Sequence, residues 1–244
     1  MNEAFRQIGT PAPGGIVAVC DHASNFVPPD IDLGIAPDLL EKHIAWDIGA
    51  AGVTEFLANE RGIPAHLAAV SRLVCDFNRD EDAPGLIPHA SDGHSIPGNL
   101  FDMEGRQNRI ERFFRPYHDG LAAWLEAAES ALILSIHSFT PCLESAPSER
   151  PWEIGILYNE DDRAARLAIT LFAEAGCIVG DNQPYSGRDL NATMNRHAEA
   201  HGRDYLGIEL RQDLIGDPAG QAKWAAVIAK VARTVAGTLA ASRN

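Results

Sequence analysis

Cysteine is scarce in this chain, and its four copies are widely spaced. Cys20, Cys75, Cys142 and Cys177 form no C-x-x-C pair, which is the spacing that thiolate zinc sites usually share. Cys20 and Cys75 lie in apolar runs and are expected to be small buried hydrophobic residues. A zinc site made of cysteine thiolates is therefore not expected.

Basic residues are also few in this chain. The 20 Lys and Arg residues face 34 Asp and Glu residues, which gives a net charge of -14 and a pI near 5.0. Nucleic acids and anionic membrane surfaces bind basic patches, so we expect neither as a partner. A small anionic substrate stays possible, because a few local arginines can hold one.

Long apolar segments are missing as well. We find no apolar run that approaches the roughly 18 residues of a membrane helix. Residues 1–7 lack the apolar stretch of a signal peptide. We therefore expect a cytoplasmic protein, and the sequence leaves the oligomeric state open.

The residues that are present predict a globular α/β protein. With 244 residues, 45% of them hydrophobic, we expect one domain over residues 1–244. Strand and helix patterns alternate, which predicts a three-layer α/β/α fold with a mixed, mostly parallel sheet. We predict strands at 15–20, 65–70, 73–77, 131–136, 153–158, 177–180 and 205–210, and helices at 37–61, 104–129, 160–176, 189–201 and from 217 onward.

Chemically active residues occur at or near three predicted strand ends. His22 follows the first strand, His137 closes the strand at 131–136, and Glu209 lies in an apolar strand. Burying such groups without a partner costs several kcal/mol. Ligand sites of these sheets lie at the carboxyl ends of strands, so two histidines and a glutamate there indicate a hydrolytic zinc site. The alternative for His22 is a cap of the following turn.

Glu209 is the candidate general base, because hydrolysis at a zinc site needs a nearby carboxylate to take a proton from water. The alternative is a structural glutamate that pairs with Arg211 or Arg72. The sequence does not decide between the two.

Asp47 is the candidate third metal ligand. It shares the apolar stripe of Ile44 and Ile48 on the predicted helix 37–61, whereas a surface helix places its charges opposite that stripe. We therefore expect Asp47 to turn inward, either as a ligand or as a buried structural carboxylate. Asn25 is its competitor, although an amide is a weak zinc ligand.

Arg72 and Arg79 flank a short apolar run and lead into a long loop at 80–103. Arginine binds carboxylates through its planar fork, so the pair indicates an anion pocket, with surface salt bridges as the alternative. Tyr185, in a glycine-containing loop, is expected to close over a substrate or to be a plain surface residue.

The pair His197 and His201 has helical spacing, but the glutamate that metalloproteases place directly after the first histidine is one residue further on. We therefore expect His201 at the surface and His197 as a weak candidate for contact with the pocket.

Taken in order, these segments resemble the N-formylglutamate amidohydrolase family and, behind it, the zinc carboxypeptidase and aspartoacylase group. The resemblance covers about residues 15–215. It rests on the segments Asp21-His22-Ala23-Ser24-Asn25, His43-Ile-Ala-Trp-Asp47-Ile-Gly, Ser71-Arg72-Leu73-Val74, Asp76-Phe77-Asn78-Arg79, Ile96-Pro-Gly-Asn99, Ile136-His137-Ser138 and Ile208-Glu209-Leu210-Arg211.

The resemblance implies a zinc-carboxypeptidase-like fold and one zinc ion per chain, held by His22, an acidic ligand and His137. The carboxypeptidases have a glutamate where this chain has Asn25, which favours Asp47 as the second ligand. The resemblance further implies particular roles for four side chains around the substrate. These are Glu209 as general base and acid, Arg72 at the oxyanion, Arg79 at the substrate carboxylate, and the neighbouring Asn78 as a substrate-binding residue.

The expected activity is zinc-dependent hydrolysis of the amide bond of an N-acylated acidic amino acid, with N-formyl-L-glutamate as the first candidate. One alternative is a metallocarboxypeptidase-like hydrolase of small peptides or cell-wall fragments. Another is a zinc-stabilised binding protein without catalysis. The sequence leaves the natural acyl group and the pathway open.

Overall fold

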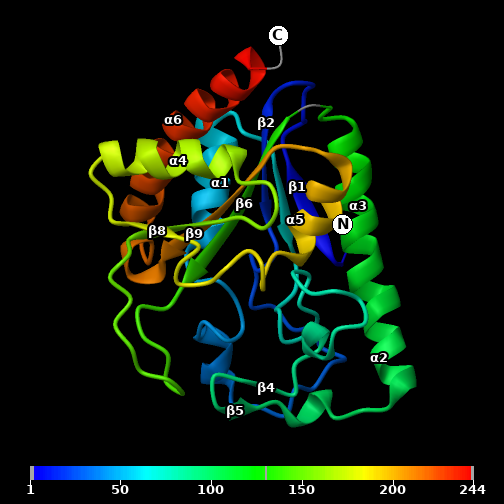
Figure 1. Ribbon diagram of the computed structural model, residues 1–244. Helices are drawn as coiled ribbons and strands as arrows, with labels where there is room; N and C mark the ends of the chain where they lie inside the picture. The colour runs from blue at the N-terminus through cyan, green and yellow to red at the C-terminus, as the bar shows by residue number, and fades with distance from the viewer. Residues whose placement is uncertain (1–2, 130, 243–244) are drawn as a thin grey trace.

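A seven-stranded sheet forms the centre of the protein in a computed structural model that describes residues 3–129 and 131–242 (Figure 1). The strand order is β1-β3-β2-β6-β9-β7-β8. Strands β3, β2, β6 and β9 are parallel, while β1 runs antiparallel to β3 and β7 antiparallel to β9. The predicted mixed, mostly parallel sheet is confirmed. The strands are β1 (Phe5–Ile8), β2 (Ile16–Cys20), β3 (Ala65–Ala68), β6 (Leu132–Phe139), β7 (Ile154–Leu157), β8 (Val179–Asp181) and β9 (Tyr205–Arg211).

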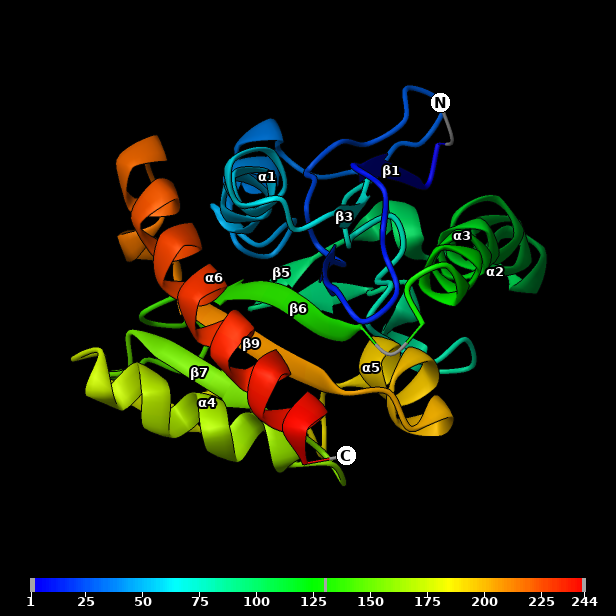
Figure 2. The same ribbon diagram turned by 90° about the horizontal axis from the view of Figure 1, so that it is seen from above.

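Helices cover both faces of this sheet (Figure 2). One face carries α1 (Ala50–Arg61), α4 (Arg163–Glu174) and α6 (Pro218–Ala241), and α6 packs against the other two. The opposite face carries α3 (Arg115–Glu126) and α5 (Ala192–His197). The predicted α/β/α layering is therefore confirmed.

Smaller elements complete the chain. Helix α2 (Met103–Arg109) continues through a π-helical turn at Ile110–Phe114 into α3, and β4 (Ala90–Ser91) pairs with β5 (His94–Ser95). In Figure 1 this hairpin lies in the lower half of the molecule, toward which the arrow of β6 points. Short 3-10 helices occur at Pro37–Glu41, Pro84–Leu86, Pro97–Asn99, Glu199–His201 and Gln212–Leu214.

Strand β6 lies at the middle of the sheet, with β2 on one side and β9 on the other. All eight of its residues are buried, as expected for a strand covered on both faces. In its register with β9, His137 is the partner of Glu209. Two polar side chains thus lie next to each other where both strands end.

The predicted helix 37–61 is wrong in its first half. Only Ala50–Arg61 is α-helical, and Asp47 lies in the turn before it. Gly49 has a φ of 82°, and a Cβ atom there would lie 2.2 Å from the carbonyl oxygen of Ile215. The chain therefore bends at a position that only glycine fits. Asp47 is buried as expected, but because of this turn rather than a helical stripe.

The predicted strand 73–77 is also wrong, because this segment is a turn. The backbone NH of Val74 donates to the carbonyl of Ser71, and the Ser71 hydroxyl donates to the carbonyl of Ala45 at 2.7 Å. These bonds replace a strand ladder and fix the segment beside the turn that holds Asp47. Strand β1, by contrast, was not predicted.

Helix α6 is the one described helix that is long and apolar enough to cross a membrane by length and composition, with a mean hydropathy of 1.2. Trp224, Ile228 and Val235 are among its buried residues, and it packs against α1 and α4. In this fold it serves as a covering helix of the core.

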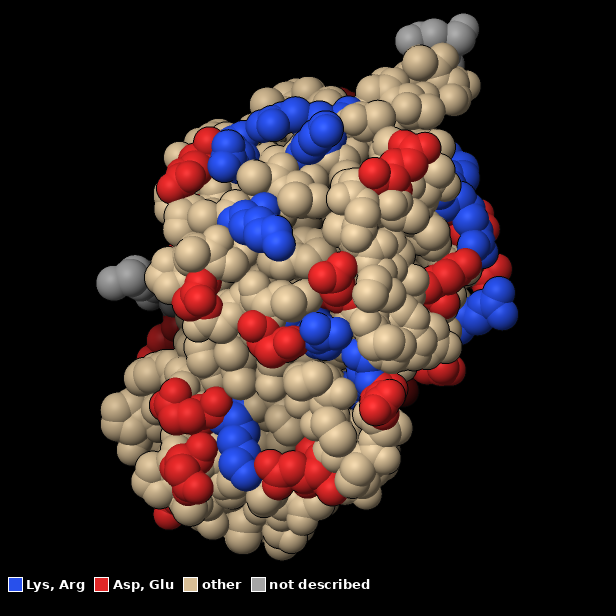
Figure 3. Space-filling view, turned by 90° about the vertical axis from the view of Figure 1, so that its left-hand side faces the viewer, with Lys and Arg blue, Asp and Glu red and all other residues tan. Residues whose placement is uncertain are grey.

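On the face seen in Figure 3, basic and acidic side chains are interspersed.

Candidate metal centre and active site

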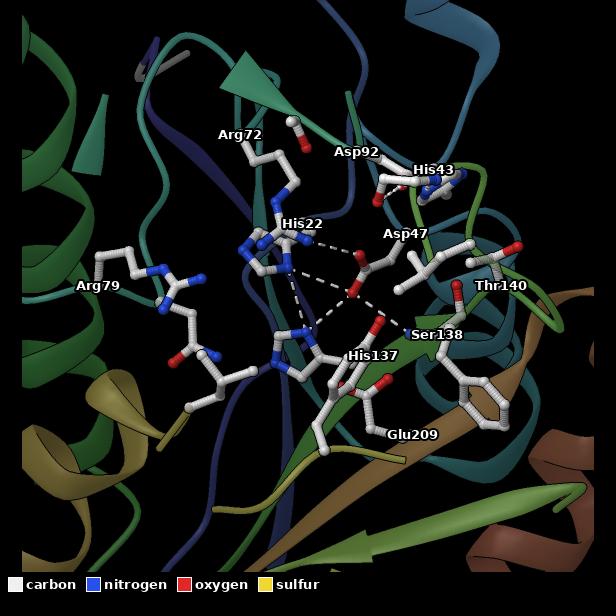
Figure 4. Close-up of a pocket in the computed structure, with 17 residues that line it drawn as sticks. His22, His43, Asp47, Arg72, Arg79, Asp92, His137, Ser138, Thr140 and Glu209 are labelled. Atoms are coloured by element: carbon white, nitrogen blue, oxygen red, sulfur yellow. Dashed lines mark hydrogen bonds and ion pairs between the residues drawn. The ribbon is translucent and has the colours of Figure 1, made fainter. Parts of the chain in front are cut away.

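Three buried side chains meet at the carboxyl ends of β2 and β6 (Figure 4). His22 follows β2, His137 belongs to β6, and Asp47 comes from the turn before α1. Asp47 Oδ2 lies 3.2 Å from His22 Nδ1 and 2.9 Å from His137 Nδ1, and the two Nδ1 atoms are 3.2 Å apart. The predicted ligand set is thus brought together with one candidate ligand atom from each side chain.

The far side of each imidazole faces another carboxylate. His22 Nε2 lies 2.7 Å from Asp76 Oδ1, and His137 Nε2 lies 3.5 Å from Asp21 Oδ2. A carboxylate accepts hydrogen bonds, so His22 Nε2 donates its proton to Asp76, and the nearby Asp21 carboxylate favours a proton on His137 Nε2 as well. In the neutral imidazoles, both Nδ1 atoms then present lone pairs to the centre of the group.

This arrangement fits a metal ion. Two imidazole nitrogens and one carboxylate oxygen this close together need a positive charge among them, either a proton or a metal ion, and nitrogen and oxygen donors of this kind are common zinc ligands. Asn25 is not part of the group, because its amide donates to the carbonyl of Leu40 and to Glu41 Oε1. The geometry therefore favours Asp47 over Asn25.

The electrostatics of the ligands agree with a cation site. Burial opposes a charge on His137, but hydrogen bonds to Asp21 and Asp47 raise the pKa of this imidazole well above its ordinary value. Burial likewise disfavours a charged Asp47, yet His22 and His137 hold the pKa of its carboxyl well below the usual range. Asp47 is thus a buried carboxylate, and its negative charge stabilises a positive charge beside it.

Glu209 lies beside this group as the strand partner of His137. Its side chain is buried, and burial raises the pKa of its carboxyl to about 7. Among the described residues, Glu209 Oε2 has no hydrogen-bond partner. The structural alternative is not supported, because Arg211 pairs with Asp213 and Arg72 with Asp76 and Asp47. A carboxyl with such a pKa suits proton transfer near neutral pH.

Two arginines line the same cavity but differ in their pairing. Arg72 donates to Asp76 Oδ2 from Nη2 at 2.7 Å and to Asp47 Oδ1 from Nη1 at 3.3 Å. Arg79 comes no closer than 3.9 Å to Asp76 and keeps about a third of its side chain exposed. Arg79 is therefore the freer cation, and Arg72 is bound to Asp47 of the candidate metal group and to Asp76 behind His22.

The cavity has a volume of about 260 Å³, which suits a small molecule rather than a polymer. Asn78 and Tyr185 line it as predicted. The phenol oxygen of Tyr185 accepts from Arg150 Nη1 at 3.0 Å, and the guanidinium also lies 5.0 Å from the Tyr185 ring centre. Arg150 donates to the carbonyl of Thr140 as well, so it joins two loops at the rim.

His197 does not line the cavity, contrary to the expectation that it faces the pocket. It is buried, and its Nε2 lies 2.9 Å from Nδ1 of His118 on α3. His118 Nε2 donates to the carbonyl of Phe77. The pair thus supports the backbone just before Asn78 and Arg79 from behind.

Sequence reasoning considered Asp76 only as a salt-bridge partner of the two arginines and assigned no role to Asp21, although these carboxylates face the two histidines, or to Asp92. Asp21 directly precedes His22, and Asp76 follows Arg72 by four residues, so local spacing carried a signal for both. His43 was noted only as part of a motif, although it lines the cavity and binds Asp92. Asp92 lies in the long loop, where the sequence offers no such cue.

Comparison with known proteins places the chain among amidohydrolases. Residues 14–216 match the family model of N-formylglutamate amidohydrolase. A gene product of Agrobacterium tumefaciens has a similar structure, with a TM-score of 0.90 and 32% identity over 97% of this chain and 96% of that chain. An N-formylglutamate amidohydrolase from Ralstonia eutropha JMP134 shares the fold, with a TM-score of 0.73 and 21% identity over 98% and 99% of the two chains. No curated relative matches the chain.

Proposed function

The chain belongs to the N-formylglutamate amidohydrolase family, and from this premise we propose that it is a zinc-dependent hydrolase of N-acylated acidic amino acids. The first candidate substrate is N-formyl-L-glutamate, which would yield formate and glutamate. The observation that carries the proposal is the placement of Glu209, with its pKa near 7, directly beside the buried His22, Asp47 and His137 group.

His22, Asp47 and His137 would hold the ion. A zinc ion bound there supplies a Lewis acid that polarises the substrate carbonyl and makes a water molecule a nucleophile near neutral pH. Asp76 and Asp21 keep the two imidazoles in the tautomer that binding requires.

Glu209 takes the proton of the attacking water and returns it to the departing amine. The water oxygen forms the new bond to the carbonyl carbon, the C–N bond breaks, and the products are a carboxylate and a free amino acid. Burial raises the pKa of this carboxyl above its ordinary value, so it holds a proton from water better than an exposed glutamate does.

The two arginines have separate roles in this proposal. Arg72, held by Asp76 and Asp47, stabilises the negative charge that develops on the carbonyl oxygen, an effect of roughly two to three powers of ten in rate. Arg79 binds the substrate carboxylate, helped by Asn78 and Tyr185. The cavity of about 260 Å³ favours such a small substrate over a cell-wall fragment.

Metal analysis followed by an amine-release assay tests the proposal. We expect about one zinc ion per chain, and amine release from N-formyl, N-acetyl or N-succinyl derivatives of glutamate in preference to those of neutral amino acids. A zinc-loaded protein that binds acidic ligands but releases no amine would be a binding protein instead.

A further inference from the structure

A second polar pair lines the cavity and has no role in the reaction as proposed. His43 lies in the turn before α1, and Asp92 lies between β4 and β5 with a φ of 42°. In Figure 4 the pair is on one side of the metal ligands, and Arg79 is on the other. The two sides of the cavity therefore offer different chemistry to a bound molecule.

Asp92 fixes the orientation of the His43 ring. His43 Nε2 lies 3.0 Å from Asp92 Oδ2, and the carboxylate also accepts from the backbone NH groups of Glu144 and Ser145 and from the Ser145 hydroxyl. With four donors and a side chain that is 4% exposed, Asp92 has little capacity left for a ligand. Its function is to hold His43.

His43 thereby keeps one ring nitrogen for a ligand. Burial lowers the pKa of its imidazole, so the ring is neutral near pH 7. Since Nε2–H donates to Asp92, Nδ1 is a lone-pair acceptor. Among the described residues, no side chain or backbone group forms a hydrogen bond with this Nδ1, although the ring lines the cavity.

The position of Arg79 sets the direction of the substrate. If Arg79 binds the carboxylate of the amino acid and the amide bond lies at Glu209 and the metal ligands, the acyl group points away from Arg79. Figure 4 shows His43 and Asp92 on that far side. The acyl group therefore extends toward a hydrogen-bond acceptor, near the Ser145 and Thr140 side chains that also line the cavity.

We propose that His43 is a specificity-determining residue, which selects short acyl groups with a hydrogen-bond donor over apolar acyl groups of equal size. Among acyl groups longer than formyl, the preferred substrate class is then an N-hydroxyacyl or N-aminoacyl derivative of an acidic amino acid. The inference rests on the proposed function, because that function supplies the direction of the substrate. An apolar group in this position would leave the Nδ1 lone pair without a partner.

Two pairs of equally sized substrates test the proposal on the zinc-loaded enzyme. N-glycolyl-L-glutamate is compared with N-propionyl-L-glutamate, and N-(3-hydroxypropionyl)-L-glutamate with N-butyryl-L-glutamate. We expect kcat/KM to favour the hydroxylated member of at least one pair by roughly 5- to 20-fold, as for one hydrogen bond gained. N-glycyl-L-glutamate shows whether an ammonium donor serves as well as a hydroxyl.

Variants of His43 connect this preference to the ring. His43→Phe keeps the ring size but removes the acceptor, so the ratio within each pair should fall to about one. His43→Gln can donate to Asp92 and still accept from the substrate, so it should retain part of the preference. His94→Phe is the matched control, because His94 bonds to Glu144 outside the cavity lining and should leave the ratios unchanged.

Because each ratio is measured within one enzyme preparation, a partly unfolded variant still gives a valid answer. A wild-type ratio near one in both pairs, or an unchanged ratio in His43→Phe, overturns the inference. If N-formyl-L-glutamate is hydrolysed in that case, the proposed function survives. If the zinc-loaded enzyme hydrolyses none of the N-acylglutamates, the proposed function and the inference are both rejected.

Discussion

Glu209 has a buried carboxyl group, and one of its oxygens is available to accept a proton from water. Its replacement by glutamine tests whether the side chain serves catalysis or only the stability of the fold. Glu209→Gln keeps the size of the side chain but cannot accept a proton. We expect kcat to fall by at least about 100-fold, as for the loss of a positioned base. Zinc content and melting temperature should stay close to those of the wild type, since no ion pair is lost.

The measurement is paired, with kcat and melting temperature taken on the same zinc-loaded variant. Glu153→Gln, outside the cavity lining, is the control for the loss of a carboxylate. A structural glutamate would give the reverse result, namely a lower melting temperature with nearly normal kcat. That result would reject the catalytic role of Glu209.

Arg79 is the less strongly paired of the two cavity arginines, and it should act in substrate binding. Arg79→Ala removes a charge-assisted contact to a carboxylate, so KM for the acidic substrate should rise about ten- to a hundredfold. Arg233→Ala, which removes a cation on α6, should leave KM unchanged. An unchanged KM in Arg79→Ala would reject the role of Arg79 in substrate binding and leave only its ion-pair contact with Asp76.

At the scale of elements, α3 and α5 are joined by the His118–His197 hydrogen bond, which needs at least one neutral imidazole. Burial lowers the pKa of His118 to about 3 and that of His197 to about 4, below the value of about 6.5 in an unfolded chain. Between these values the unfolded state binds more protons than the folded state. Stability should therefore fall as the pH decreases from about 6.5 toward 4, by about 1.4 kcal/mol per pH unit for each histidine that stays neutral.

Denaturant unfolding from pH 7.5 to 4.5 checks this expectation. His118→Gln has one buried imidazole fewer, so its free energy of unfolding should depend less steeply on pH than that of the wild type at equal metal loading. The partly exposed His94 provides the control, and His94→Gln should keep the wild-type slope. Equal slopes for all three proteins would show that the pair does not stay neutral.

The elements that the sequence predicted well are those whose pattern is a direct result of burial. Strand β2 is a continuous apolar run, β6 and β9 are buried strands made mainly of apolar residues, and polar residues at or near the ends of the three strands became the site. The segments 42–49 and 73–77 were mistaken for a helix and a strand, because long-range bonds replace local ones there. The close approach of Gly49 to Ile215, 166 positions later, has no local signal.

The site could be predicted in part for the same reason. His22 and His137 follow buried strands, so a local pattern located them, and Asp47 was found although the helix invoked for it was wrong. His43 and Asp92 could not be paired in advance, because 49 positions separate them and the hairpin that carries Asp92 has strands of only two residues. His197 was misplaced because a helical pattern does not show which face is covered by α3.

At the scale of the whole molecule, the proposed ligands come from positions 22, 47 and 137, so an unfolded chain does not present them together. A metal ion held by these three side chains would bind the folded state, and its removal should destabilise the protein. At a metal concentration of 1,000 times Kd the loss is about 4 kcal/mol, or roughly 10 °C in melting temperature.

A thermal melt with and without a chelator measures the effect, and added zinc should restore the original value. His22→Ala lacks one ligand and should melt at the same temperature with or without chelator. If the melting temperature of the wild type is the same with and without chelator, His22, Asp47 and His137 do not hold a stabilising metal ion.

The register of β6 and β9 has a consequence for how the family can vary in length. His137 and Glu209 both face the cavity because the register of β6 and β9 makes them direct partners. Side chains alternate along a strand, so the insertion or deletion of one residue within β9 would turn Glu209 to the opposite face of the sheet. By contrast, the exposed turn at 175–178 between α4 and β8 lies outside the cavity lining and can lengthen or shorten at little cost. In active homologues, gaps and insertions should therefore accumulate there and be missing from the stretches equivalent to 132–139 and 205–211.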